Sequence, residues 1–167
     1  MERILQLLNE METKGLIQRY AIGGGMAVMF YAEPVVTEDL DIFVLLPPTN
    51  SPVIVLTPLY DFFRELGYQV RGLYVDVEGW LVRFLPTASE LEVEALMEAL
   101  EVNYGSTTMR VIRAEHLIAM KLKVGREKDL LHVHMLLRQA KIDHDYLQGV
   151  LQRHGLIEKW RKFLGGG

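Results

Sequence analysis

The chain contains one segment, residues 20–44, in which a short apolar strand, three consecutive glycines, an apolar helix and a strand with two aspartates follow one another. The helix is expected to stop before Pro34, because the residue before a proline disfavours helical backbone. A strand, a tight turn, a helix and a second strand in this order predict a sheet with helices packed on it. These elements are predicted at residues 17–22, 23–25, 26–32 and 39–46.

The rest of the chain adds elements of both kinds, so the predicted fold class is α/β (α+β), a mixed sheet flanked by helices with a C-terminal helical tail. We expect a core over residues 1–113, a helical segment over 114–164 packed on that core as one compact unit, and a flexible end at 165–167. The further helices are predicted at residues 2–14, 57–66, Ser89 to about Leu100 and from Ala114 onward, and the further strands at 68–76, 79–85 and 108–113.

Composition narrows the class of function. Of the 167 residues, 50% are hydrophobic and 24% are charged, which is typical of a globular domain. The absence of cysteine excludes disulfides, thiolate metal sites and thiol nucleophiles. A net charge of -4 argues against a dedicated, sequence-general nucleic-acid binder. No apolar run approaches the roughly 20 residues that span a bilayer, so we expect a cytoplasmic protein without a membrane partner.

Asp39 and Asp41 are the first candidate site residues. They are two apart on a predicted strand, where side chains alternate between faces, so both carboxylates point the same way. Two adjacent carboxylates repel each other, and a divalent cation between them removes that repulsion. Mg²⁺ prefers oxygen ligands and commonly takes one or two carboxylates together with substrate phosphates. The pair therefore predicts an Mg²⁺ (or Mn²⁺) site, and a solvated strand end is the alternative.

The turn Gly23–Gly25 is the second candidate. Glycine lets backbone N–H groups approach a phosphate closely, and the N-terminus of the following helix adds favourable partial charge. The spacing is neither that of a dinucleotide-binding fingerprint nor that of a P-loop. A glycine turn followed by a strand with two acids is consistent with a metal–nucleotide site, and a tight turn without a ligand is the alternative.

The sequence Ile22-Gly23-Gly24, followed by a helix and Thr37-Glu38-Asp39-Leu40-Asp41-Ile42, resembles the signature of the nucleotidyltransferase superfamily related to DNA polymerase β. The two glycines, Ala27 and the threonine before the acids look most like the small bacterial AbiEii-type branch. That branch includes abortive-infection and toxin–antitoxin nucleotidyltransferases. The resemblance implies Mg²⁺-dependent transfer of a nucleoside monophosphate from an NTP, and a nucleotide-binding role for Thr37 beside the glycines.

A second segment carries the same resemblance. Residues 115–121 (EHLIAMK) and 125–129 (GREKD) are similar to a downstream block of the AbiEii-type branch. The resemblance implies that Lys121 and Arg126 face the triphosphate as cations. It also implies that Asp129 orients one of them or acts near the acceptor hydroxyl. The alternative is a hinge between two helices in which Asp129 makes only local capping contacts.

The chain departs from the superfamily at one position that matters for activity. Many members carry a third carboxylate on a later strand, where residues 79–85 of this chain offer Arg83 and no acid. Asp76 and Glu78 lie close in sequence, near the expected hairpin turn. Glu94 is a further acid that we consider as a replacement. The missing acid bears on how the attacking hydroxyl would be activated.

Two functional hypotheses follow. The first is an Mg²⁺-dependent nucleotidyltransferase that acts on an RNA 3′ end, a protein or a small molecule, with a toxin–antitoxin role and a cognate antitoxin as partner. The second is a weak or inactive nucleotidyltransferase-fold protein that binds a nucleotide or a partner. The expected catalytic residues are Asp39, Asp41, Lys121 and Asp129, the expected metal ligands are Asp39 and Asp41, and the expected nucleotide-binding residues are Gly23, Gly24, Gly25, Thr37, Lys121 and Arg126.

Overall fold

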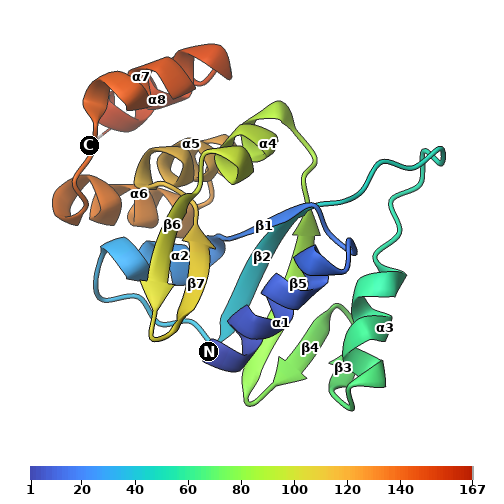
Figure 1. The fold of residues 1–167 in the computed structure, drawn as a ribbon. Helices are drawn as coiled ribbons and strands as arrows, with labels where there is room; N and C mark the ends of the chain where they lie inside the picture. The colour runs from blue at the N-terminus through green and yellow to red at the C-terminus, as the bar shows by residue number, and fades with distance from the viewer. Residues whose placement is uncertain (167) are drawn as a thin grey trace.

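A computed structural model describes residues 1–166 and contains, within that range, a seven-stranded mixed sheet and eight helices (Figure 1). The mixed α/β class predicted from the sequence is confirmed. Gly167, the last residue of the end expected to be flexible, lies outside the described residues. The strands are β1 (Arg19–Ile22), β2 (Asp39–Leu45), β3 (Gln69–Arg71), β4 (Tyr74–Val77), β5 (Trp80–Pro86), β6 (Leu100–Tyr104) and β7 (Thr107–Val111).

The helices cover the sheet and extend beyond it. Helix α1 packs against β1 and β7, helices α2 and α4 pack against β2, and α5 contacts α2, α4, α6, α7 and α8. Figure 1 shows α7 and α8 farther from the sheet than α5. The helices are α1 (Glu2–Thr13), α2 (Gly24–Tyr31), α3 (Thr57–Glu65), α4 (Glu90–Met97), α5 (Ala114–Val124), α6 (Glu127–Gln139), α7 (His144–Arg153) and α8 (Ile157–Gly165). Among residues 1–166, no helix is both long and apolar enough to cross a membrane.

Strand β2 lies at the centre of the sheet, which has the order β3-β4-β5-β2-β1-β7-β6. It pairs antiparallel with β1 and parallel with β5, so that Asp41 lies opposite Arg83. Its alternating pattern buries Leu40, Ile42 and Val44 completely. The intervening side chains, including Asp41, point to the opposite face of the sheet. The core therefore fixes the direction in which the aspartates point.

Three predicted element boundaries are wrong. The strand expected over 68–76 is split into β3 and β4, because Gly72 adopts a φ of +61° and turns the chain back on itself. The helix expected to reach Leu100 ends at Met97, and β6 begins at Leu100 to pair antiparallel with β7. Helix α2 begins at Gly24, inside the predicted turn. In each case, glycine conformation or long-range strand pairing overrides the local pattern.

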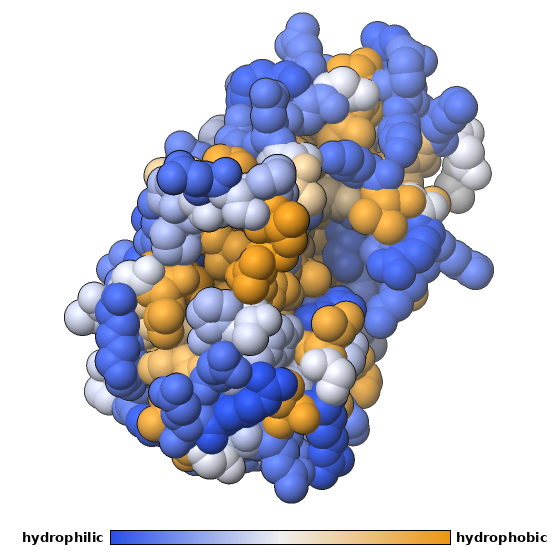
Figure 2. All heavy atoms as spheres, turned by 90° about the vertical axis from the view of Figure 1, so that its right-hand side faces the viewer, coloured by the Kyte–Doolittle hydropathy of each residue, from blue (hydrophilic) through white to orange (hydrophobic). Residues whose placement is uncertain are grey.

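The loop between β2 and α3 forms a separate apolar surface. Figure 2 views the side of the molecule on which α3 lies, and apolar side chains gather in the middle of this face. Val53, Ile54 and Val55 are exposed and line a hollow of about 370 Å³ together with Leu16 and Leu59. This hollow shares no lining residue with the cavity that holds the predicted site.

The glycine turn is packed directly on β2. The N–H of Gly23 donates a hydrogen bond to the backbone carbonyl of Asp41 at 3.0 Å. Gly24 has a φ of +59°, and a methyl group added to it would lie 2.6 Å from Oδ2 of Asp41. A side chain on Gly23 would meet the ring of Phe43 at 2.5 Å. The first two glycines are therefore required by the close approach of the turn to the acidic strand.

We predict that Gly24→Ala destabilises the protein more than Gly72→Ala. Both residues have φ near +60°, so both substitutions impose the same left-handed backbone strain on alanine. Only at Gly24 does the new methyl group collide with Asp41, whereas Gly72 has no atom within 4 Å of the added group. The expected difference in the free energy of unfolding is about 1–2 kcal/mol. Urea titrations of both variants measure it, and equal losses would contradict the proposed close packing.

Candidate active site

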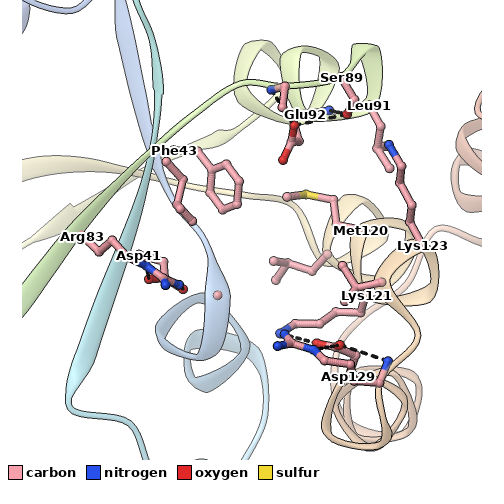
Figure 3. A pocket seen from close by; sticks show the side chains of 16 residues that line it. Asp41, Phe43, Arg83, Ser89, Leu91, Glu92, Met120, Lys121, Lys123 and Asp129 are labelled. Atoms are coloured by element: carbon pink, nitrogen blue, oxygen red, sulfur yellow. Dashed lines mark hydrogen bonds and ion pairs between the residues drawn. The ribbon is translucent and has the colours of Figure 1, made fainter. Parts of the chain in front are cut away.

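A cavity of about 490 Å³ lies between strands β2 and β5 on one side and helices α4, α5 and α6 on the other (Figure 3). Two charged clusters face each other across it, and Gly24 also lines it. One contains Asp41 and Arg83 from the sheet, and the other contains Lys121, Arg126 and Asp129 from the α5–α6 junction. The apolar part of the wall is formed by Phe43, Leu85, Leu91, Leu117, Met120 and Val124.

Asp41 and Arg83 form a two-point ion pair. Nε of Arg83 donates to Oδ1 of Asp41 at 3.1 Å, and a terminal nitrogen donates to Oδ2 at 3.3 Å. The side chain of Asp41 is 20% exposed, and that of Arg83 is 33% exposed. The hydrogen bond to Asp41 raises the pKa of the Arg83 guanidinium, so this cation stays charged at every accessible pH. Parallel pairing of β2 with β5 is what places the two side chains opposite each other.

Asp39 lies two residues before Asp41 and is exposed. Its backbone N–H donates to the hydroxyl of Thr37 at 3.2 Å, and that hydroxyl donates to the carbonyl of Asp39 at 3.1 Å. Thr37 also lies beside the glycine turn, because a methyl group added to Gly25 would lie 3.4 Å from its Cβ. Thr37 therefore orients the start of β2 against the turn.

Asp129 organises the opposite cluster. Its side chain is only 3% exposed and accepts hydrogen bonds from the N–H of Arg126 at 3.2 Å and from its Nε at 2.8 Å. Nζ of Lys121 lies 3.5 Å from the other carboxylate oxygen. Burial raises the pKa of Asp129, but the contacts with Arg126 and Lys121 outweigh it and leave the pKa below its usual value. Asp129 thus caps α6 and holds two cations at the cavity.

Burial also affects Lys121. Its side chain is 14% exposed, and burial lowers the pKa of its ammonium group, while Asp129 partly opposes that shift. Arg126, by contrast, is 75% exposed and extends its guanidinium from the cavity rim. The two cations therefore differ in solvent exposure, although both contact the same carboxylate.

The structure brings five of the nine predicted site residues to the cavity wall. The other four border it, on the turn or at the start of β2. The residues that line the cavity are Gly24, Asp41, Lys121, Arg126 and Asp129, and those outside its lining are Gly23, Gly25, Thr37 and Asp39.

Sequence reasoning missed the apolar wall and the pairing of Arg83. Phe43 follows Asp41 by two residues on the same strand, so alternation alone would have placed it on the site face. No sequence pattern indicates the ion pair between Arg83 and Asp41. It depends on the register between two strands that lie about 40 residues apart in the chain.

Glu94, considered as a replacement acid, does not line the cavity. It accepts two hydrogen bonds from Arg153, at 2.9 and 3.2 Å, and lies 2.8 Å from Nε2 of His116. Burial raises the pKa of Glu94, but its contacts with Arg153, His116 and His154 overcome this effect and lower the pKa to about 2. Glu94 therefore joins α4 to α5 and α7, and the idea that it replaces the third carboxylate is wrong. Asp76 and Glu78 do not line the cavity either.

The donor set fits a metal ion that arrives with a nucleotide. In the part of the chain that the structure describes, no three His, Asp or Glu side chains are grouped closely enough to hold a metal by themselves. Asp39 and Asp41 nevertheless offer carboxylate oxygens from one face of β2. Mg²⁺ commonly uses one or two protein carboxylates and completes its coordination with water and substrate phosphates. Asp39 and Asp41 are therefore the residues that could hold Mg²⁺ together with a substrate phosphate.

Comparisons with known proteins bear on the family and the fold of the chain. A family profile described as "Nucleotidyl transferase of unknown function (DUF2204)" matches residues 1–148. A search of curated proteins gave no significant match. One similar solved structure is an antigenic nucleotidyltransferase-like protein from Paracoccidioides brasiliensis, with a TM-score of 0.55 and 16% identity over 98% of this chain and 89% of that one. Another is the antibiotic-resistance factor ANT(2'')-Ia, with a TM-score of 0.50 and 14% identity over 95% of this chain and 94% of that one.

We predict that Glu94→Gln destabilises the protein at neutral pH and that the effect fades in acid. The pKa of Glu94 is lowered to about 2 in the folded state from an ordinary value of 4.5. Its charge therefore contributes stability above about pH 4.5, and this contribution is lost as the pH falls from there toward 2. The expected loss at pH 7 is about 1–2 kcal/mol, measured by urea unfolding at pH 7 and pH 3.5.

Glu90→Gln is the matched control, because Glu90 lies exposed at the start of the same helix. It should change the free energy of unfolding by a few tenths of a kcal/mol. A loss in Glu94→Gln that is equally large at pH 3.5 would show that the carboxylate charge is not what joins the helices.

Proposed function

The chain belongs to this nucleotidyl transferase family, and from that membership we propose that it transfers a nucleoside monophosphate from a nucleoside triphosphate to an acceptor hydroxyl. The observation that supports this function is the convergence on one cavity of Asp41, Gly24 and the cationic cluster of Lys121 and Arg126. These groups come from three separate parts of the chain. An acidic strand, a glycine turn and a pair of cations in one place suit a triphosphate that carries a divalent metal.

The cations bind and orient the phosphates in this proposal. Arg83, Lys121 and Arg126 face the cavity with charged donors, and phosphate oxygens are strong acceptors for such groups. The backbone of the glycine turn approaches the phosphates at the start of α2, where helix N–H groups point outward. Asp39 and Asp41 would hold Mg²⁺ or Mn²⁺, which when bound neutralises charge on the phosphate oxygens.

The chemical step is an in-line displacement. The acceptor oxygen attacks the α-phosphorus, the bond from that phosphorus to the bridging oxygen breaks, and pyrophosphate leaves with the electron pair. The hydroxyl proton passes to solvent. Asp129 is a poor acceptor for it, because this carboxylate is engaged with Arg126 and Lys121 and its pKa lies below the usual value. Catalysis would come mainly from positioning and from charge stabilisation. The apolar wall around Phe43, Leu91 and Met120 suits the flat face of a nucleobase.

Asp41→Asn is expected to abolish transfer, because it removes the carboxylate charge at the centre of the cavity. The measurement is transfer of label from α-³²P-NTPs to total RNA, total protein or small-molecule fractions with Mg²⁺ or Mn²⁺, with an expected fall of at least 100-fold. Asp61→Asn is the matched control, since Asp61 is an exposed aspartate on α3 that contacts Arg64. Equal label transfer by wild type and Asp41→Asn would overturn the proposed site.

Arg83 favours a second candidate function. A cation stands opposite Asp41 where many superfamily members carry a third carboxylate, which is consistent with a protein that binds a nucleotide or a partner without transferring. Thermal stabilisation of the wild type by an NTP with Mg²⁺, together with no label transfer to any acceptor, would support this candidate over the enzyme.

A toxin of the AbiEii-type branch is the finer form of the first proposal. It places the protein in the cytoplasm, with a cognate antitoxin as partner and an RNA 3′ end, a protein or a small molecule as acceptor. Induced expression in a bacterial host should then arrest growth, and Asp41→Asn expressed at the same level should not. Equal growth with wild type and variant would contradict the toxin role and leave the transfer proposal standing.

A further inference from the structure

We propose that Arg83 closes the metal site of the free protein and opens it only when a triphosphate is bound. This inference rests on the proposed nucleotide site. The guanidinium of Arg83 donates hydrogen bonds to both oxygens of Asp41. Phosphate oxygens give the guanidinium another partner, and Asp41 then becomes available to a divalent cation. Metal and nucleotide would therefore bind together, and the metal alone would bind poorly.

The contacts of Asp41 make its carboxylate hard for a free metal ion to reach. Oδ1 accepts from Nε of Arg83, and Oδ2 accepts from a terminal nitrogen of the same side chain. Gly24 packs closely against Oδ2. A methyl group added to Gly24 would lie only 2.6 Å from this oxygen. Mg²⁺ needs oxygen ligands at roughly 2.0–2.1 Å and gives up its own water reluctantly. A free metal ion must therefore displace a two-point guanidinium contact before it reaches Asp41.

The charged side chains that line the cavity favour a nucleotide over a free metal ion. Arg83, Lys121, Lys123 and Arg126 line it with four cations, against the carboxylates of Asp41, Glu92 and Asp129. Glu92 is already engaged with the N–H of Ala88 and the hydroxyl of Ser89, and Asp129 is engaged with two of the cations. The lining therefore carries one more positive than negative charge, with Asp39 just outside it, and its cations attract a polyanion such as a triphosphate more than a free divalent cation.

The position of Arg83 allows the exchange of partners. Its side chain is 33% exposed and lines the cavity, so phosphate oxygens can reach its guanidinium. The guanidinium carbon lies 5.7 Å from the centre of the Tyr74 ring, which supports the side chain from the neighbouring strand β4. A planar guanidinium contacts carboxylate and phosphate with the same two-point geometry. Binding of a triphosphate would thus give the Arg83 guanidinium phosphate oxygens in place of the Asp41 carboxylate.

Thermodynamic coupling follows from this exchange. If nucleotide releases Asp41 to the metal, then metal must increase the affinity for nucleotide by the same factor. Arg83 is in this sense a positioning residue that determines when the metal binds. It needs no direct role in bond formation.

The test compares Mn²⁺ binding by wild type, Arg83→Gln and Lys123→Gln, followed by calorimetry and by the paramagnetic resonance signal of free Mn²⁺. Without nucleotide, Arg83→Gln should bind Mn²⁺ at least tenfold more tightly than wild type. Lys123→Gln is the matched control, because it removes the same charge from the same cavity and frees neither Asp41 nor Asp129 from its ion pair. It should change Mn²⁺ affinity less than threefold. Equal gains in both variants would mean that only net charge matters and would overturn the inference.

The second arm adds a non-hydrolysable nucleotide, α,β-methylene-ATP. In wild type it should raise Mn²⁺ affinity at least tenfold, and in Arg83→Gln this increase should fall below threefold. Arg83→Lys keeps the charge but loses the two-point contact. Its nucleotide-dependent increase in Mn²⁺ affinity should lie between those of wild type and Arg83→Gln. This variant keeps the test informative if Arg83→Gln fails to fold. Tight Mn²⁺ binding by nucleotide-free wild type would overturn the inference.

The outcomes separate this inference from the proposed function. Coupled binding of Mn²⁺ and nucleotide with no label transfer would reject the enzyme and support the role of Arg83. Label transfer lost in Asp41→Asn, with tight Mn²⁺ binding by free wild type, would support the enzyme and reject the role of Arg83.

Discussion

The close contact between the glycine turn and Asp41 determines how the rest of the site is built. Gly23 donates a backbone hydrogen bond to Asp41, and Gly24 lies directly beside its carboxylate. Strand β2 can therefore sit against the start of α2 with no side chain between them. The same strand pairs with β5, which brings Arg83 to the other side of the carboxylate. One aspartate thus connects a helix start, a strand pair and the cavity.

The second half of the site depends on a different kind of constraint. At the α5–α6 junction, a single buried carboxylate holds one buried and one exposed cation. Removing one partner from such a cluster leaves a buried charge without a counter-charge. The resulting loss of folding free energy is larger than the net stabilisation that the contacts provide. The cationic side of the cavity is therefore enclosed near Lys121 and open to solvent near Arg126.

Local sequence signals predicted the parts of this molecule that depend on short-range physics. Alternation along β2 placed Asp39 and Asp41 on one face, and Ser89 correctly marked the start of α4, where its hydroxyl accepts from the N–H of Glu92. Features that depend on distant pairing were not predictable. Strand β6 exists because β7 pairs with it, and Arg83 reaches Asp41 only through the register of β5 with β2.

Glu94 also shows where the limits of sequence reasoning lie. As a sequence feature it is one acid in the run Glu90, Glu92, Glu94 and Glu98, a pattern typical of a solvated helix face. Its partners His116 and Arg153 lie 22 and 59 residues away, and nothing local to α4 indicates them. The fold class followed from the sequence, and five of the predicted residues line one cavity, whereas the ion pairs that join the elements were not predictable.

The contacts of Glu94 have a consequence for one wall of the cavity. Helix α4 carries Leu91 and Glu92, which line the cavity, and Glu94, which contacts α5 and α7. Arg153 and His154, which hold Glu94, lie beyond residue 148, where the match to the family profile ends. The position of α4 beside the cavity is thus braced by chain outside the family match. A change in α7 can therefore alter the shape of the cavity without altering any residue that lines it.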